Sequence, residues 1–238
     1  MQLSVIPVLV IVIFGFLIFF IRKLYSLGQL NTAKKNWFQI LLVILLVWGG
    51  FSGYLSSSGI YVSADFLQLA PGYWLPYIPV IITVTLVLLI TPLRNGLREF
   101  VDYVPDYWLT GIHVLRILAL GALIKATMGL FPEKFAWYVG IPDLLFGLSA
   151  IPVTLLVRQQ RLKNNILVFW HLTGALVIMI PTIGFMHIFM KERIFSELFT
   201  FPMALAPTLV VPMLVMLNLM VVWRLLERKF ITKSSYVY

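Results

Sequence analysis

The chain of 238 residues contains no cysteine, which excludes disulfide bonds, thiolate nucleophiles and metal or iron–sulfur sites with cysteine ligands. Charged residues make up only 11% of the sequence, and just nine residues are acidic. Soluble domains carry about 25% charged residues, so this composition excludes an ordinary soluble protein. The sequence also lacks a His-Glu-x-x-His zinc pair, a G-x-S-x-G nucleophile elbow and a P-loop. We therefore expect neither enzyme activity nor a bound metal ion.

Hydrophobic residues are what the chain has in excess, at 61% of the sequence with a mean hydropathy of +0.98. A helix crosses the apolar core of a bilayer with about 20 apolar residues. Hydropathy therefore predicts an all-α fold, a polytopic transmembrane bundle that forms one domain over residues 1–238. The seven predicted spans cover about residues 5–21, 37–54, 75–93, 108–130, 137–157, 166–190 and 203–226.

Lysine and arginine alternate along the chain in a way that predicts its orientation. The connections after the first, third and fifth spans and the C-terminal tail are rich in these residues: Arg22, Lys23, Lys34 and Lys35, then Arg94 and Arg98, then Arg158, Arg161 and Lys163, then Arg228, Lys229 and Lys233. Basic connections stay in the cytoplasm. The pattern predicts an external N-terminus and a cytoplasmic C-terminus. The first run has no basic residues before it, so we expect a retained span rather than a cleaved signal peptide.

Ionisable residues inside spans are costly in lipid and usually face the interior of the bundle, where they find partners. Lys125 lies five residues before the end of the fourth predicted span, and Asp143 lies six residues after the start of the fifth. At 1.5 Å per residue both lie at about the same depth below the outer surface. We therefore predict an ion pair between Lys125 and Asp143. Its role is open: it could fix helix register or serve in transport.

Small residues recur at spacings of three and four on both of these spans, as in helices that pack closely. On the fifth span the stripe includes Asp143 itself, and Ala122 and Lys125 share the stripe of the fourth. The predicted packing positions are Gly129, Gly140, Gly147 and Ala150.

A second polar group is predicted in the cytoplasmic half, from the fourth, sixth and seventh spans. Its members are His113, Arg116, His171 and Asn218. Two histidines at one depth could hold a b-type haem, although hydrogen bonds to backbone or headgroups explain them as well. Prolines interrupt the sixth and seventh spans at Pro181, Pro202, Pro207 and Pro212. Broken helices around polar side chains are typical of transporters.

The segments "RILALGALIKATMGLFPEKFAWYVGIPDLLFGLSAIPVTLL", "WHLTGALV" and "FPMALAPTLVVPMLVMLNLM" resemble a group of uncharacterised bacterial polytopic membrane proteins. The residues that match its pattern are Arg116, Pro132, Gly140, Asp143, Gly147, Phe201, Pro202 and Pro207. The resemblance covers roughly the C-terminal half. It implies a bacterial inner-membrane location and supplies no activity.

Together these features predict an integral inner-membrane protein that acts without catalysis, as a binding or accessory component of a membrane assembly. The alternatives are a small proton-coupled or solute transporter that uses Lys125 and Asp143, and a redox subunit that binds haem or quinone. The expected partners are membrane lipids and other membrane subunits or further copies of the chain. The net charge of +9 is explained by topology and lipid contact, so we expect no nucleic-acid binding.

Overall fold

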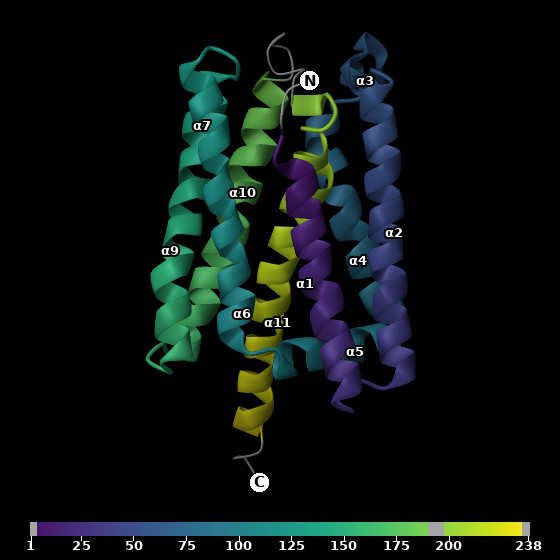
Figure 1. Cartoon of the computed structure of the whole chain (residues 1–238), viewed down its shortest axis with the longest axis vertical. Helices are drawn as coiled ribbons and strands as arrows, with labels where there is room; N and C mark the ends of the chain where they lie inside the picture. Colours follow the sequence, from purple (N-terminus) through teal and green to yellow (C-terminus); the bar gives the residue numbers. More distant parts are fainter. Residues whose placement is uncertain (1–3, 190–197, 235–238) are drawn as a thin grey trace.

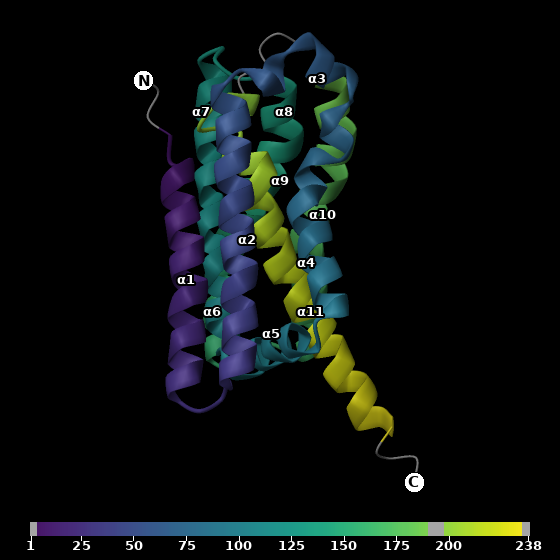
Figure 2. The ribbon, with the colours of Figure 1, turned by 90° about the vertical axis from the view of Figure 1, so that its right-hand side faces the viewer.

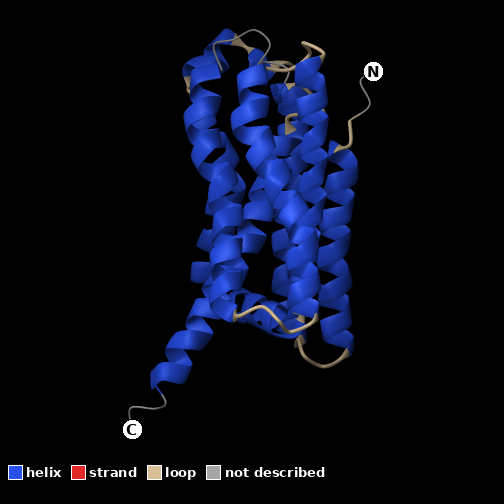
Figure 3. Ribbon diagram, turned by 90° about the vertical axis from the view of Figure 1, so that its left-hand side faces the viewer, coloured by secondary structure: helices blue, strands red, loops and turns tan. Residues whose placement is uncertain are grey.

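The computed structural model describes residues 4–189 and 198–234, with side chains described in these ranges except for 181–189 and 230–234. Helices joined by short loops make up this part of the chain, as Figure 3 shows, and it contains no strand. The long helices are α1 (Ile6–Ser26), α2 (Thr32–Ser57), α4 (Ile78–Leu89), α5 (Thr91–Tyr103), α9 (Ile141–Arg158), α10 (Asn164–Phe189) and α11 (Val211–Ser234). The shorter ones are η1 (Ile60–Val62), α3 (Ala64–Gln68), η2 (Pro71–Tyr73), η3 (Leu75–Tyr77), α6 (Asp106–Gly111), η4 (Ile112–Ala119), α7 (Leu120–Thr127), α8 (Glu133–Phe135), η5 (Ala136–Gly140) and η7 (Ala206–Val210).

Several of these helices join end to end into longer rods. Six helical stretches of the described residues are long and apolar enough to cross a membrane: Ile6–Ser26, Thr32–Ser57, Pro71–Leu89, Asp106–Thr127, Glu133–Arg158 and Ala206–Lys229. The described side chains of α10 add a shorter apolar stretch, Asn164–Ile180. The prediction of an all-helical chain with membrane-length apolar helices is confirmed. The side chains of Pro181 and His187 lie outside the described residues.

The helix that contains α11 lies at the centre of the bundle. In an apolar window of 18 residues in this stretch 61% of the residues are buried, against 22–39% in the corresponding windows of the other five. Figures 1 and 2 show α11 running between the other helices and continuing beyond them at its C-terminal end. The start of α1 and the end of α11 lie at opposite ends of the bundle (Figure 1).

Local signals in the sequence set the turn between α1 and α2. Gly28 adopts a φ of 71°, a left-handed conformation that glycine enters without steric cost. Asn31 then caps α2, because its side-chain oxygen accepts a hydrogen bond of 2.9 Å from the backbone N–H of Lys34. The two helices therefore run as an antiparallel hairpin.

Helix α5 lies across one end of the bundle instead of along it (Figure 1). The predicted third span runs to residue 93, but the helix breaks at Ile90, whose backbone is extended, and Pro92 occupies the first turn of α5. One face of α5 buries Leu93, Leu97 and Phe100 in the core, and its polar face carries charged residues. Helix α5 is therefore amphipathic, and this explains its position: its charged face can contact water at the end of the bundle but not in the apolar middle.

The polar face of α5 is joined to α11 by ion pairs. Arg224 donates hydrogen bonds of 2.8 and 2.6 Å to the two carboxylate oxygens of Asp102, and Arg228 donates a further bond of 2.9 Å. Burial raises the pKa of Asp102, but the hydrogen bonds and charges of the two arginines outweigh it. The pKa of Asp102 therefore lies below its ordinary value of 3.8.

Apart from the short 3₁₀ turns η2 and η3 at the start of the Pro71–Leu89 stretch, three segments depart from α-helical geometry inside the long rods. The segment η4 is a 3₁₀-helix of eight residues, and η5 and η7 are single π-helical turns. Pro207 lies at the start of η7, where a missing N–H favours a change in the hydrogen-bond pattern. Long 3₁₀ stretches and π-turns are uncommon, and π-turns are frequent at functional sites.

Candidate functional site

Arg116 and Asp143 form an ion pair at the place where η4 packs against α9. The guanidinium Nε donates to the carboxylate of Asp143. The side chain of Arg116 is fully buried, and that of Asp143 is 17% exposed. Arg116 also donates 2.7 Å from Nη1 to the carbonyl of Gly174 on α10, and its guanidinium carbon lies 4.3 Å from the centre of the Phe146 ring. One arginine therefore connects three helices.

The structure pairs Asp143 with Arg116, and the partner predicted from the sequence, Lys125, was wrong. The error came from the estimate of depth. The helix that contains Asp143 begins at Glu133, so Asp143 lies ten residues inside it, whereas Lys125 lies only two residues before the end of α7 at Thr127. Arg116 lies eleven residues before that end and is therefore at the level of Asp143. Burial and a cation at the same depth decide the pairing.

The predicted packing residues of η5 and α9 lie at contacts between helices. A Cβ on Gly147 would lie 2.7 Å from the backbone nitrogen of Ile117 and 2.8 Å from the carbonyl carbon of Arg116, so only glycine allows this approach. Gly140 faces the side chain of Leu123, and Ala150 is completely buried. The absence of a Cβ at Gly147 thus lets η4 bring Arg116 against α9.

Gly129 has a different role from the one predicted. A Cβ built on it would meet no atom of the described residues within 4 Å, so it is not a packing position. Its φ of 70° places it in the left-handed region, and its N–H donates to the carbonyl of Ala126. Gly129 therefore ends α7 in the manner common for glycine at helix C-termini.

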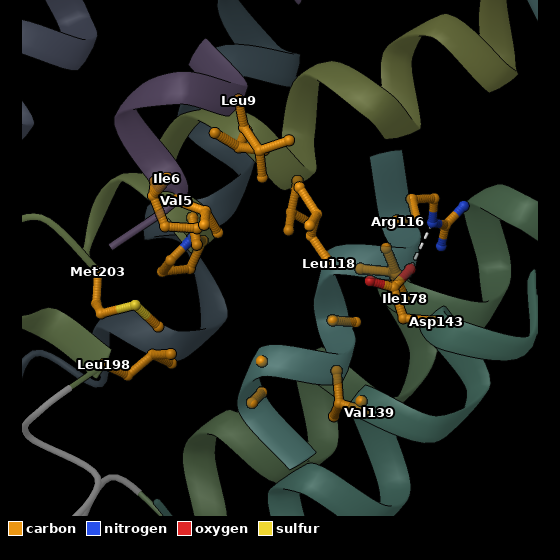
Figure 4. Close-up of a pocket in the computed structure, with 18 of the residues that line it drawn as sticks. Val5, Ile6, Leu9, Arg116, Leu118, Val139, Asp143, Ile178, Leu198 and Met203 are labelled. Carbon is orange, nitrogen blue, oxygen red and sulfur yellow. Dashed lines mark hydrogen bonds and ion pairs between the residues drawn. The ribbon is translucent and has the colours of Figure 1, made fainter. Parts of the chain in front are cut away.

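A cavity of about 270 Å³ adjoins the ion pair. Its wall is mostly apolar, and the charged residues that line it are Arg116, Lys125 and Asp143. The segments η4, η5 and η7 all contribute to this wall: Arg116 and Ala119 from η4, Val139 and Gly140 from η5, and Pro207 and Val210 from η7. In Figure 4 the ion pair lies on one side of the cavity, and Val5, Ile6, Leu9 and Met203 lie on the other.

The histidines form a second polar group beside Arg116. His113 and His171 are both completely buried, and their rings meet edge to face with centres 5.7 Å apart. His171 Nδ1 shares a hydrogen bond of 2.7 Å with Asn218 Oδ1. His113 and Arg116 are three residues apart in η4, and side chains at this spacing eclipse in a 3₁₀-helix. The structure thus places the four predicted residues of the cytoplasmic-half cluster close together.

The surroundings of the two histidines do not fit a haem. A haem with two axial histidines needs a flat slot between the imidazole rings for the macrocycle. Here the two rings are in direct contact, and Phe146 and Trp170 also pack against His113, each with a ring-centre distance of 5.8 Å. In the described part of the chain, no group of three histidine or acidic side chains is arranged to hold a metal ion.

These helices and this polar cluster lie in a region that matches a known family model. A model described as a domain of unknown function, DUF8737, matches residues 73–226, which is more than half of the chain. The chain belongs to the DUF8737 family. No curated protein and no solved structure matches it. The resemblance to an uncharacterised family is therefore confirmed.

The DUF8737 region contains all three charged residues that line the cavity and both buried histidines. It leaves out α1 and α2, although Val5, Ile6 and Leu9 close the apolar side of the cavity. The polar part of the site therefore belongs to the family region, and the first helix completes its wall.

Sequence reasoning missed two kinds of residue in this DUF8737 site. Phe146 and Trp170 stack with ring centres 4.3 Å apart and pack on Arg116 and the histidines, but aromatic residues are too frequent in apolar helices to stand out. Gly174 accepts a hydrogen bond through its backbone carbonyl, which any residue possesses. The spacing of His113 and Arg116 did carry a signal, because side chains three residues apart lie on one face of a helix.

Proposed function

We propose that this protein is a membrane-embedded binding protein that takes up a small lipid-soluble ligand in the cavity beside Arg116 and Asp143. We place it in a bacterial inner membrane with seven spans, an external N-terminus and a cytoplasmic C-terminus; α10 forms the span that the six membrane-length stretches leave out. The alternation of basic connections supports this orientation. The start of α1 and the end of α11 lie at opposite ends of the bundle, which supports an odd number of spans. The absence of catalytic sequence motifs supports binding without catalysis.

The observation that carries the proposal is the convergence of three irregular helical segments on one cavity. A helix that departs from α geometry frees backbone groups, which is tolerated in a membrane only where protein or a cavity satisfies them. A single irregular segment would be explained by its local sequence alone. Three that meet at a cavity with a buried ion pair indicate a site that is maintained at a cost in stability.

A cavity-filling variant tests this proposal. Ala122 lines the cavity on α7, so Ala122→Phe should fill part of it, whereas Leu120→Phe on the exposed face of the same helix should not. Each protein is purified in mild detergent, and the small molecules that accompany it are identified by mass spectrometry. We expect a stoichiometric compound in the wild type and in Leu120→Phe that is lost from Ala122→Phe. Equal retention by both variants would contradict binding in this cavity.

The same preparation tests the accessory role. An accessory subunit retains other membrane proteins, or further copies of itself, in a fixed ratio after gentle solubilisation. Protein mass spectrometry identifies the retained proteins, and the mass of the complex without its detergent gives the number of copies of each. A single, monomeric chain would contradict assembly while leaving ligand binding open to its own test.

Transport is a second candidate, and the interrupted helices around the cavity favour it. Discontinuous helices beside polar side chains are how transporters form substrate sites near the middle of the membrane. The buried series Asp143, Arg116, His113 and His171 would supply the polar interior of such a path. Uptake of the co-purifying compound into vesicles, with and without a pH gradient, measures this activity. Binding of the compound without any uptake would contradict transport and would favour a binding protein.

A further inference from the structure

We infer that the ligand of this cavity is an anionic amphiphile, a molecule with one negatively charged group on a single apolar tail. The inference rests on the proposed binding function and adds the class of ligand. It follows from the charges that line the cavity, from the placement of those charges and from the size and shape of the cavity.

The charged lining of the cavity carries a net positive charge. Arg116 and Asp143 neutralise each other in their ion pair. Lys125 is half-buried, and no ion pair of Lys125 is present among residues 4–189 and 198–234. An ammonium group beside an apolar wall gains strongly from a nearby anion, because little water is present to screen the attraction. The ligand group that complements this cavity is therefore negative.

The ion pair with Arg116 also reduces the repulsion that the carboxylate of Asp143 would exert on an anionic ligand. Asp143 is the single acidic side chain among the described residues of the lining, and it would repel a negative ligand if it were unpaired. The guanidinium of Arg116 compensates that charge and is itself held by the carbonyl of Gly174. A cationic ligand, by contrast, would meet Lys125, which has no ion pair among the described residues, and a carboxylate that already has a partner.

The remainder of the wall fits an apolar tail. On the side away from the ion pair, Figure 4 shows Ile6, Leu9, Leu198 and Met203 turned toward the cavity. The volume of about 270 Å³ lies just below the range of roughly 300–1,000 Å³ that is usual for small-molecule sites. This space suits one alkyl chain of a fatty acid or similar compound and is too small for a phospholipid with two chains.

A matched pair of photoreactive probes tests the inference. One probe is a fatty acid with a diazirine in its chain, and the other is the corresponding fatty alcohol, which has the same tail and no charge. Each is added to the purified full-length protein in lipid nanodiscs and irradiated, and the labelled residues are identified by peptide mass spectrometry. We expect the acid to label cavity residues such as Val139 and Val210 more strongly than the alcohol does.

Variants of Lys125 identify the source of the preference. Lys125→Met removes the charge and retains an apolar stem, so the acid should bind about tenfold more weakly while the alcohol is unaffected. Lys125→Arg should retain the preference. Lys134→Gln, at an exposed lysine that does not line the cavity, should behave as the wild type. Thermal unfolding of each variant in the same nanodiscs confirms that it is folded.

The outcomes separate this inference from the proposed function. Equal labelling of cavity residues by the acid and the alcohol would overturn the anionic class and leave binding in the cavity intact. A preference for the acid that Lys125→Met does not reduce would overturn the role of the lysine charge and with it the inference. Failure of both probes to label cavity residues would overturn the inference and the proposed function together.

Discussion

At the scale of single residues, Asp143 depends on Arg116 for its place inside the bundle. Asp143→Asn would leave the fully buried guanidinium without its counter-charge, and breaking a buried pair in this way costs roughly 3–5 kcal/mol. We therefore expect Asp143→Asn to lower the unfolding temperature clearly. The measurement is the thermal unfolding of the wild type and the variant in the same detergent, monitored by circular dichroism at 222 nm.

Lys125→Gln provides the control for this pairing. Lys125 is half-buried and outside the Arg116–Asp143 pair, so its replacement should change the free energy of unfolding by less than about 0.5 kcal/mol. A loss as large as that of Asp143→Asn would show that Lys125, not Arg116, is the partner that matters.

At the scale of helices, the close contact between η4 and α9 depends on Gly147. Gly147→Ala places a methyl group 2.7 Å from the backbone of Ile117, where no flexible side chain can move aside. Overpacking of this kind costs roughly 1–3 kcal/mol. Gly15→Ala in α1 is the matched control, because a Cβ there meets nothing within 4 Å, and alanine should stabilise that helix by up to about 1 kcal/mol. Similar unfolding temperatures for the two variants would contradict the close packing.

The junction of α5 with α11 should weaken in acid. The pKa of Asp102 is lower in the folded protein than its ordinary value of 3.8, so the folded state binds the proton less readily than the unfolded state. The stability that Asp102 contributes is present above about pH 4 and is lost as the pH falls through the folded pKa. Asp102→Asn should abolish this part of the acid sensitivity. Unfolding temperatures of both proteins between pH 6 and pH 3 measure it, and parallel curves would contradict the assignment.

The sequence predicted the long helices well because apolar length is a strong signal, and it predicted their irregular parts poorly. Periodicity arguments assume 3.6 residues per turn, so they did not predict the 3₁₀ segment that contains His113 and Arg116. The hydropathy start of the fifth span at Trp137 also missed the turn that begins at Glu133. This error placed Asp143 too close to the end of its span and led to the wrong partner, although Asp143, Arg116 and the histidines were all recognised as polar positions.

At the scale of the whole molecule, the site is assembled from parts far apart in the chain. The family region, 73–226, supplies the polar residues, and the first turns of α1 close the apolar side of the cavity. The cavity lies toward one end of the bundle, because α7, which contains Lys125, and the start of α1 lie toward that end and α5 lies at the other. If the basic connections are cytoplasmic, the cavity lies in the outer half of the membrane.

Single-cysteine labelling tests this orientation, and the absence of native cysteine means that each introduced thiol reports alone. Ser58→Cys follows α2 at the end predicted to be external, whereas Ser26→Cys and Gln159→Cys lie at the end predicted to be cytoplasmic, and all three positions are exposed. A membrane-impermeant maleimide should label Ser58→Cys in intact cells and the other two only after permeabilisation. The reverse pattern would invert the molecule and place the cavity on the cytoplasmic side, where its ligand would come from the inner leaflet. The accessible leaflet thus decides which pool of anionic amphiphiles can reach Lys125.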